Sequence, residues 1–569
     1  MVKEATHNRM NKRRDIMRLA LSVVALVLCN IVGSFVFHRF DLTSENRYTL
    51  SPQSKEIAKN MKDVAFFKVY LDGKDLPAGF VHLRDETKEM LDEFKAYSNN
   101  NVQYEFINPS ADPANKEALF HQLYENGLEP LDLHVKQSSG NSESIIWPGA
   151  LLSYKGRQMP INLMERKMDA NPQTQLNNSI EALEYDIDNA IHKIDLNTKP
   201  VVAFIQGQGE LDSIHLAGAI GALSEYYDVR LLHINHMLKG LQMCKAIIIA
   251  KPTMPIDDKD AYIIDQFIMH GGKVMWLIDP LYTPMDSLAM NGITMAFPNN
   301  LNLEDQLFRY GVRVNNNVIL DAQSSAIPMN TAFRGQEPKW ELKPWLFEPL
   351  ISSNSDNPIV KNLNYVELNI AATVDTIAKP GIKKTILLRT SKFTRLLNAP
   401  VRIALAMALD QPDQREFTQH FQPVAVLLEG KFTSAYKGRI AMNPDSLRVL
   451  NPVYDGAQTA MIVVGDGDVI ANNANVKDGE KFAYPLGYDI YTKQQFGNKD
   501  FIVNAMNYLC GDSALLTIRT KQLQLRMLDG VKAATYRTQW QVINMVIPVA
   551  LIMLLGMVWA WIRKEKYAK

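Results

Sequence analysis

Two uncharged apolar runs, one near each end of the chain, constrain its architecture most. Residues 19–37 read LALSVVALVLCNIVGSFVF, and residues 542–562 read VINMVIPVALIMLLGMVWAWI. Each run is long enough to cross a bilayer as a helix, and each Leu, Ile, Val or Phe favours insertion by roughly 0.3–0.6 kcal/mol. Pro548 is compatible with this role because membrane helices tolerate proline. The sequence therefore predicts a transmembrane helix at each end.

Basic residues beside these runs predict their orientation, since Lys and Arg concentrate on the cytoplasmic side. They precede the first run and follow the second: Lys12, Arg13, Arg14, Arg18, Arg563, Lys564, Lys566 and Lys569. We therefore expect cytoplasmic tails at 1–18 and 563–569 and an extracytoplasmic body. Two alternatives stay open: a signal peptide cleaved near Ser34, and a lipoprotein signal, which Leu28 before Cys29 disfavours.

Composition excludes several classes of function. Lys and Arg together number 61, as do Asp and Glu, so no overall field attracts nucleic acid. The cysteines, Cys29, Cys244 and Cys510, form no C-x-x-C pair, which argues against a zinc knuckle or a thioredoxin-type redox site. Cys244 and Cys510 could pair only if the fold brings them together; otherwise they act as small buried hydrophobes. We expect no metal and no cofactor.

The body begins with an expected small α/β domain at 40–195. Ser51 and Pro52 are typical of a helix start. Strands are expected at 64–71 and 102–107, with a helix at 82–98 between them. A further helix at 174–194 closes the domain. The order is thioredoxin-like, without the redox cysteines.

A second α/β domain is expected in two parts, at 199–280 and 457–511. Strands at 200–205, 229–234, 246–250 and 273–278 alternate with helices at 214–226 and 258–269, and a strand at 460–464 precedes a helix at 499–509. Apolar strands of this kind predict a parallel sheet covered on both faces, flavodoxin-like or amidotransferase-like in type. A β-rich insertion would occupy 281–456, with extended segments at 386–388 and 424–428. A helical return at 512–541 would lead back to the membrane.

Motifs of catalysis are absent from the sequence. It contains no G-x-x-x-x-G-K-[ST], G-x-S-x-G, H-E-x-x-H or EF-hand loop. His233 and His236 form H-x-x-H at a strand end, where alternation places them on opposite faces and disfavours a shared metal. We expect a protein that is not an enzyme.

Polar residues directly after the apolar strands are the candidate ligand-binding residues. They are Gln206, Gln208, Glu210, Asp279, Asp466 and Asp468. Ligands of open parallel sheets bind outside the carboxyl ends of the strands, where these side chains would gather. Carboxylate and amide oxygens there suit a cation or a hydroxyl-rich ligand. The alternative is turn chemistry, to which Gly and Asp are equally suited.

Several segments together resemble a known family. They are FDLTSENRYTLSPQSKEI, LRDETKEMLDEFKAY with YEFINP, LEDQLFRYGVRVN, LISSNSDNPIVKNL, PVAVLLEGKFTSAYKGRI and FGNKDFIVNAMNYL. Across almost its whole length the chain is similar to GldG, the auxiliary, substrate-binding component of the gliding-motility-associated ABC transporter of Bacteroidota. One departure is Gln208, which stands where the family pattern would have His.

The resemblance implies a periplasmic body anchored in the inner membrane by both helices. It also implies partners on separate chains, a GldF-type permease and a GldA-type ATPase. Asn30, Gly33 and Ser34 would then be packing points against partner helices, because small and polar residues favour helix contacts in lipid. The alternative is an envelope glycan- or peptide-binding scaffold, or a hydrolase with convergent carboxylates.

Overall fold

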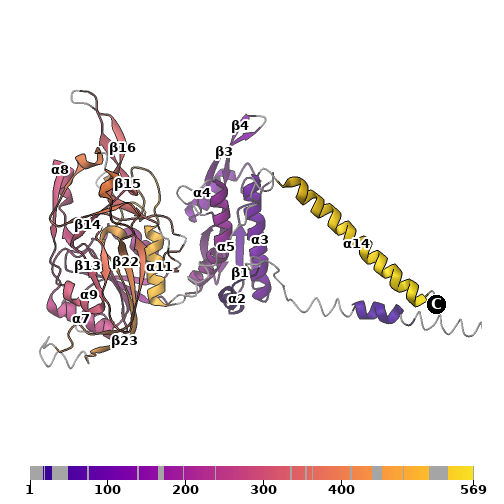
Figure 1. The fold of residues 1–569 in the computed structure, drawn as a ribbon, viewed down its shortest axis with the longest axis horizontal. Coiled ribbons are helices and arrows are strands. Elements are labelled where there is room, and N and C mark those ends of the chain that lie inside the picture. Colours follow the sequence, from indigo (N-terminus) through magenta and orange to yellow (C-terminus); the bar gives the residue numbers. More distant parts are fainter. Residues whose placement is uncertain are drawn as a thin grey trace, which may run out of the picture. The chain divides into compact units, whose positions relative to one another are not determined.

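The structure used here is a computed structural model, and Figure 1 labels its elements. It describes residues 17, 19–27, 49–73, 76–137, 140–164, 172–196, 198–237, 239–332, 336–352, 355, 357–361, 363–410, 413–438, 452–477, 480–511 and 536–567. The chain divides into two compact units, Met1–Gln522 and Leu523–Lys569. The expected mixed α/β class is confirmed, whereas the division of the body into two domains stays a prediction.

The first sheet along the chain has four strands, in the order β2-β1-β5-β6. Its strands are β1 (Ala65–Val69), β2 (Val102–Phe106), β5 (Gly149–Tyr154) and β6 (Arg157–Asn162), of which β1 and β2 are parallel. Helices α2 (Pro52–Lys59), α3 (Ala78–Tyr97) and α5 (Pro172–Asp195) accompany the sheet, with α4 (Lys116–Glu125) and the hairpin of β3 (Leu131–Gln137) and β4 (Gly140–Ile146). Ser51 caps α2 as expected: its hydroxyl accepts a hydrogen bond from the Ser54 amide at 3.1 Å.

A seven-stranded sheet follows, in the order β19-β22-β23-β10-β9-β7-β8. Its strands are β7 (Val201–Gln206), β8 (Asp228–His233), β9 (Cys244–Ala250), β10 (Lys273–Leu277), β19 (Ile382–Arg389), β22 (Pro423–Thr433) and β23 (Asp455–Val464). The five strands from β23 to β8 are parallel, whereas β22 and β19 are antiparallel.

The expectation of a parallel sheet is confirmed for these five strands, whereas two antiparallel strands extend the sheet further. The extended segments at 386–388 and 424–428, assigned to an insertion, belong to β19 and β22 and extend the sheet beyond β23. The physical reason is burial: every residue from Val424 to Leu428 is at most 2% exposed, so this strand needs neighbours on both sides and both faces.

Helices cover both faces of this sheet. Side chains alternate along β7, so that Phe204 packs with α6 (Ala217–Ser224) and α11 (Asn498–Cys510), while Ala203 and Ile205 pack with α7 (Asp258–Met269) and α9 (Glu304–Tyr310). The expected helices at 214–226, 258–269 and 499–509 correspond to α6, α7 and α11. The two apolar layers hold the parallel strands in a fixed frame.

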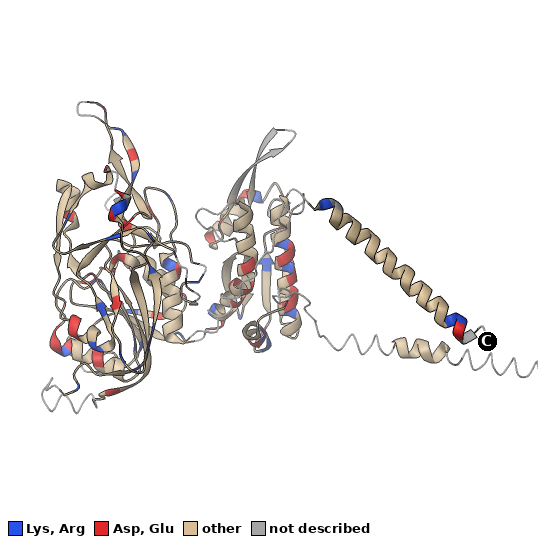
Figure 2. Cartoon of the chain, viewed as in Figure 1, with Lys and Arg blue, Asp and Glu red and all other residues tan. Residues whose placement is uncertain are grey.

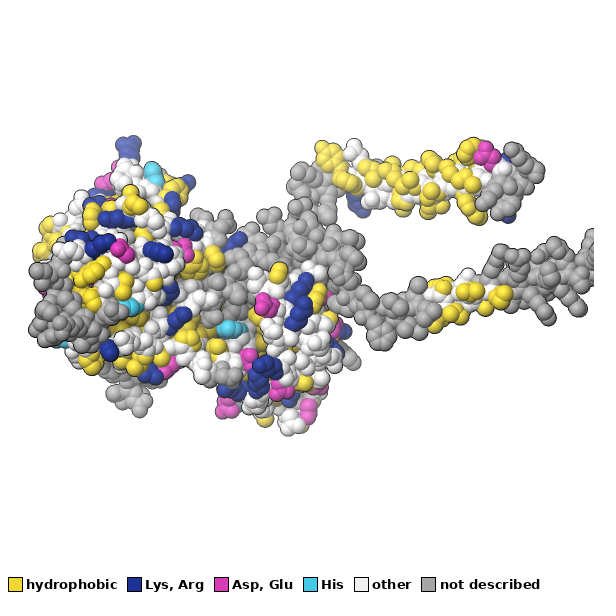
Figure 3. Space-filling view, turned by 90° about the horizontal axis from the view of Figure 1, so that it is seen from below, with side chains coloured by type: hydrophobic (Ala, Val, Ile, Leu, Met, Phe, Trp, Pro, Cys, Tyr) yellow, Lys and Arg dark blue, Asp and Glu magenta, His cyan; other side chains and the backbone are white. Residues whose placement is uncertain are grey.

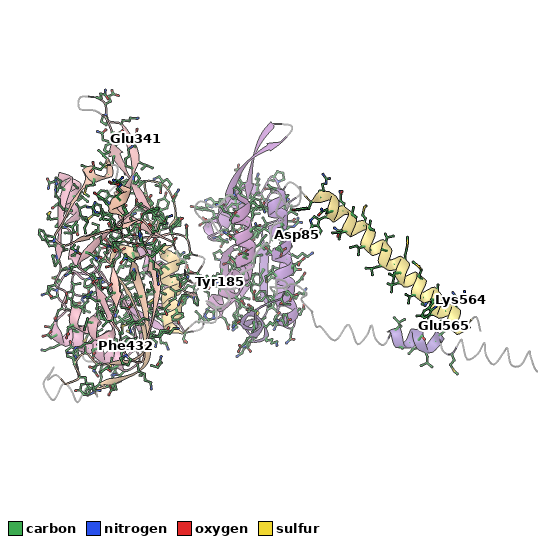
Figure 4. All side chains as sticks on the ribbon, viewed as in Figure 1. Asp85, Tyr185, Glu341, Phe432, Lys564 and Glu565 are labelled. Carbon is green, nitrogen blue, oxygen red and sulfur yellow. The ribbon has the colours of Figure 1, made fainter. Side chains whose placement is uncertain are left out.

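The rest of 281–456 consists of short antiparallel pairings. They are β11 (Leu281–Tyr282), β12 (Ile293–Pro298) and β21 (Val401–Ala404); β13 (Val312–Val314) and β18 (Val374–Thr376); β14 (Asn317–Asp321) and β20 (Thr394–Asn398); and β15 (Ser324–Asn330), β16 (Trp340–Ile351) and β17 (Val366–Glu367). The short helix α8 (Met285–Asn291) lies between β11 and β12. Trp345, Phe347 and Ile403 lie in their shared core, and Figure 4 labels Glu341 on the projecting part of β16. A last hairpin joins β24 (Ala474–Lys477) and β25 (Glu480–Ala483).

The second unit contains α14 (Arg537–Tyr567). Within its stretch Gln539–Glu565, an 18-residue window has a mean hydropathy of 2.4, and among the described residues this is the helix long and apolar enough to cross a membrane. Figure 3 shows hydrophobic side chains along this helix, and Figure 2 shows charge confined to its ends. The expected span at 542–562 lies inside it.

The other membrane expectations fall largely outside the described residues. Residues 19–27 of the first expected span are helical, but Asn30, Gly33 and Ser34 are not among the described residues, and neither is most of the expected return at 512–541. A second span therefore stays a prediction.

Candidate functional site

The carboxyl ends of three adjacent parallel strands bring four charged side chains together. Lys251 follows β9, Asp279 follows β10 and Asp468 follows β23. The Lys251 Nζ lies 2.6 Å from both carboxylate oxygens of Asp468 and 3.4 Å from Asp279 Oδ2. Asp466 lies beside them and is fully buried. The three predicted aspartates thus gather around one ammonium group.

Backbone amides hold two of these carboxylates in place. Gly467 donates its N–H to Asp279 Oδ1 at 2.5 Å, and Asp468 donates its N–H to Asp466 Oδ1 at 2.8 Å. The backbone N–H of Asn369 donates to Asp466 Oδ2 at 3.0 Å. A Cβ atom on Gly467 would lie 2.6 Å from Lys251 Cβ, so glycine permits this close approach. Turn chemistry and charge pairing therefore occur in the same residues.

Burial and charge shift the pKa values of this cluster. Burial raises the pKa of Asp279 to about 6, although the ammonium of Lys251 acts against the rise. Burial also raises the pKa of Asp466 well above its usual range, and the nearby carboxylates of Asp279 and Asp468 add to the effect. For Lys251, burial alone would lower the pKa, but the three carboxylates outweigh it and the pKa is raised. The lysine is therefore a permanent cation.

Three members of the cluster, but not Asp466, line a cavity of about 290 Å³, which we call the rim pocket. Lys251, Asp279, Asp468 and Asn369 line its polar part, and Asp286 contributes a further carboxylate. Leu281, Tyr282, Met285 and Ile370 line its apolar part. With three carboxylates against one ammonium, the lining has an excess of hydrogen-bond acceptors, which suits a cationic or hydroxyl-rich group.

The loop that holds Gln206, Gln208 and Glu210, which we call the glutamine loop, does not line the rim pocket. The Gln206 amide donates to the Leu211 carbonyl at 3.2 Å, and the Gln208 N–H donates to Glu210 Oε2 at 2.7 Å. Burial raises the pKa of Glu210. The six predicted residues thus form two groups, one at the pocket and one inside its own loop.

A second set of bonds ties this loop to the one after β9. The amides of Thr253 and Met254 both donate to the Gln208 carbonyl, at 3.0 and 2.9 Å. Gly209 has φ +74°, and a Cβ atom there would lie 2.2 Å from Thr253 Oγ1. Glycine is needed here for the turn and the loop contact, so ligand binding by Gln206, Gln208 and Glu210 stays a prediction.

Two carboxyl groups beyond the rim keep their protons to a higher pH than usual. Burial raises the pKa of Glu348 on β16 to about 8, with further contributions from Glu367, Asp489 and Asp468. Burial also raises the pKa of Glu367 to about 7. At neutral pH these groups carry protons that a solvent-exposed carboxyl group would have lost.

The remaining sequence candidates are accounted for briefly. No disulfide joins Cys244 and Cys510, and Cys244 is buried. His236 Nδ1 lies 3.1 Å from Asp260 Oδ1. Within the part of the chain that the structure describes, no group of three His, Cys, Asp or Glu side chains is arranged to hold a metal ion.

Sequence reasoning missed Lys251 and Asn369. Lys251 directly follows the apolar run Ala246–Ala250, just as Asp279 follows its strand, so the rule that selected Asp279 also selects Lys251. Asn369 lies between the short strands β17 and β18, and no local pattern identifies it.

Residues 199–505, more than half of the chain, match the family model ABC_transp_aux, described as an ABC-type uncharacterized transport system. The chain belongs to this family. It is an auxiliary component of an ABC transporter, and its match covers the parallel strands and the 281–456 stretch together. Residues 44–153 match a second model, described as a domain of unknown function (DUF7088).

Two similar proteins can be named. An uncharacterized protein of Borreliella burgdorferi is 23% identical over 448 residues, which cover 76% of this chain and 81% of that protein. The solved structure titled mmIFT52 N-terminal domain has a TM-score of 0.31 at 12% identity, covering 54% of this chain and 96% of that one. At that TM-score the likeness indicates nothing about this protein's fold or function.

Proposed function

We propose that the protein is a non-catalytic, membrane-anchored subunit of an ABC transporter complex of the gliding-motility-associated type. The observation that carries this proposal is the family match over 199–505. The finer assignment to the GldG type is supported by the sequence segments named above, from FDLTSENRYTLSPQSKEI to FGNKDFIVNAMNYL.

The membrane arrangement proposed is two spans with both ends in the cytoplasm, in the inner membrane, and a periplasmic body. The apolar length of α14 supports one anchor, and the basic residues Arg563, Lys564 and Lys566 after it support a cytoplasmic end. Figure 4 labels Lys564 and Glu565 at this end of α14. The uncharged run at 19–37 supports the other anchor.

The proposed partners are a GldF-type permease and a GldA-type ATPase on separate chains. An ABC transporter requires ATP hydrolysis, and this sequence has no phosphate-binding G-x-x-x-x-G-K-[ST] loop of its own. Packing of α14 against permease helices would bury its apolar surface in protein as well as in lipid.

A non-catalytic body is supported by the state of the rim carboxylates. Asp279 and Asp466 already accept hydrogen bonds from backbone amides, and Asp468 is paired with Lys251. A hydrolase would instead need a carboxylate free to transfer a proton to its substrate.

Affinity purification of the full-length protein from native membranes in a mild detergent tests the proposal. We expect a permease and an ATPase to co-purify in fixed ratio. Recovery of the protein alone, from cells that also contain both partners, would contradict it. A reporter fused to the last residue tests the topology, and we expect activity only for a reporter that works in the cytoplasm.

A further inference from the structure

A second cavity lies among residues 322–421, which come later in the sequence than β7 and β9. Its volume is about 410 Å³, and residues 322–323, 352, 355, 386–393 and 421 line it. We call it the basic pocket, because Arg389 and Lys392 line it and, among the residues that the structure describes, no aspartate or glutamate does. It takes its residues from the end of β19, the loop before β20 and the segments after β14, after β16 and before β22.

Its cations have no carboxylate partner among the described residues. Within the described part of the chain no ion pair of Arg389 is found, and the Lys392 Nζ lies 4.8 Å from the centroid of the Phe393 ring. The Gln323 Nε2 is a buried donor without an acceptor. Buried donors of this kind are uncommon in proteins, so their hydrogen-bonding capacity is available to a ligand that brings acceptors.

The nearest buried carboxylate serves the wall of the pocket. Asp321 is fully buried, and its oxygens accept hydrogen bonds from the Ser391 amide at 2.8 Å, the Ser391 hydroxyl at 2.6 Å and the Thr394 hydroxyl at 3.0 Å. These bonds fix the loop that follows Arg389 and carries Lys392. The Asp321 carboxylate is thus already hydrogen-bonded to backbone and hydroxyl groups of the loop.

A second segment holds the same loop from the other side. Phe421 donates its N–H to the Ser391 carbonyl at 3.0 Å, and Thr390 donates its N–H to the Gln422 carbonyl at 2.9 Å. The backbone of Phe421 has φ +51°, a conformation that residues other than glycine rarely adopt and that clusters at functional sites. The walls are therefore prearranged, which lowers the entropic cost of binding.

Two exposed aromatic rings, Phe393 and Phe421, complete the lining. Exposed phenylalanine offers an apolar surface that water solvates poorly. The cavity thus combines two cations without a carboxylate partner, one unsatisfied donor and two apolar rings.

We propose that the basic pocket binds an anionic ligand, a phosphate or carboxylate group joined to an apolar or aromatic portion. Arg389 supplies a planar fork of donors that matches such an anion, and Lys392 supplies a second positive charge. The inference goes beyond membership of a transporter and does not depend on it. A soluble phosphorylated compound and a phospholipid headgroup share this chemistry.

The test is isothermal titration calorimetry on the full-length protein in neutral detergent micelles. The probes are inorganic phosphate, phenyl phosphate, and phosphatidylglycerol or phosphatidylcholine mixed into the micelles. We expect saturable binding of phenyl phosphate tighter than that of inorganic phosphate if the source is soluble, and of phosphatidylglycerol over phosphatidylcholine if it is a lipid.

The double variant R389Q/K392Q should weaken binding about ten-fold or more, the effect of losing charged hydrogen-bond partners. The matched control R402Q/K431Q removes the same charge from β21 and β22, at residues that do not line the pocket, and should leave binding within about two-fold. The single variant K392E changes an exposed side chain and should weaken binding even if the double variant fails to fold. Equal weakening by the control, or no saturable binding of any probe, would overturn the proposal whatever partners co-purify.

Discussion

The rim pocket and the basic pocket are two cavities with opposite charge. The rim pocket has three carboxylates around one lysine, and that lysine is already paired with Asp468 and Asp279. The basic pocket has two cations, neither of which has a carboxylate partner among the described residues. The difference shows that a conspicuous cluster of charge can be largely satisfied internally, whereas a less conspicuous one keeps its binding capacity.

The largest effect should come from removing the single cation of the rim. Lys251→Met would leave Asp468 and Asp279 without their partner, and we expect a loss of about 3 kcal/mol in the free energy of unfolding. Urea titration in detergent, followed by tryptophan fluorescence, measures it. Lys431→Met, at an exposed position of β22, is the control and should change little. A loss below about 1 kcal/mol would mean that the rim is not held together by charge.

The next effect concerns pH and the acidic side of the comparison. Burial raises the pKa of Glu348 from 4.5 to about 8, so the folded state keeps a proton that the unfolded state releases. Stability from this group is fully present below about pH 4.5 and falls as pH rises toward 8. Glu348→Gln should flatten that fall and raise stability at pH 8 by about 2 kcal/mol. Parallel pH profiles of variant and wild type would contradict this.

A smaller effect tests the close approach beneath the rim. In Gly467→Ala, the new methyl group would meet Lys251 Cβ at 2.6 Å and Asp279 Oδ1 at 3.0 Å, and we expect a loss of about 1–2 kcal/mol. The backbone itself allows alanine there, with φ −81°. Gly221→Ala in α6 meets nothing within 4 Å and should be stabilising by up to about 1 kcal/mol. Thermal unfolding of both variants separates crowding from backbone effects.

The smallest expected effect tests whether the charge of the rim pocket influences the affinity of the basic pocket. Asp286→Asn removes one carboxylate from the rim pocket, and it should leave the affinity of the basic pocket for phenyl phosphate within about two-fold at 0.15 M salt, because screening is strong beyond roughly 8 Å. Titration calorimetry measures the change. A larger gain in affinity would mean that the two pockets share one electrostatic field.

The sequence predicted the acidic rim far better than the basic pocket. Asp279, Asp466 and Asp468 could be placed together because each follows an apolar strand, and parallel strands end at one edge. Arg389, Lys392, Gln323 and Phe421 come together only through antiparallel pairings between β14, β19, β20 and β22. Such pairings leave no local periodicity that would reveal partners so distant in sequence.

The same lack of a local signal for antiparallel partners explains why the sequence did not predict the full set of strands in the seven-stranded sheet. The apolar runs at β7, β9 and β10 were clear, yet β19 and β22 were assigned elsewhere because their distance along the chain concealed their place beside β23. The sequence predicts the glutamine loop beside Asp279. Instead, the Gln208 carbonyl accepts hydrogen bonds from the backbone N–H groups of Thr253 and Met254, which hold the loop away from the rim pocket.

The pairing of β10 with β23 has a consequence for biosynthesis. Val274 pairs with Met461, so the apolar edge of β10 emerges from the ribosome long before the strand that covers it. At about 5–20 residues per second, that edge stays uncovered for roughly 10–40 s. We therefore expect nascent chains arrested between these two strands to recruit chaperones, and chains released after residue 464 to escape them.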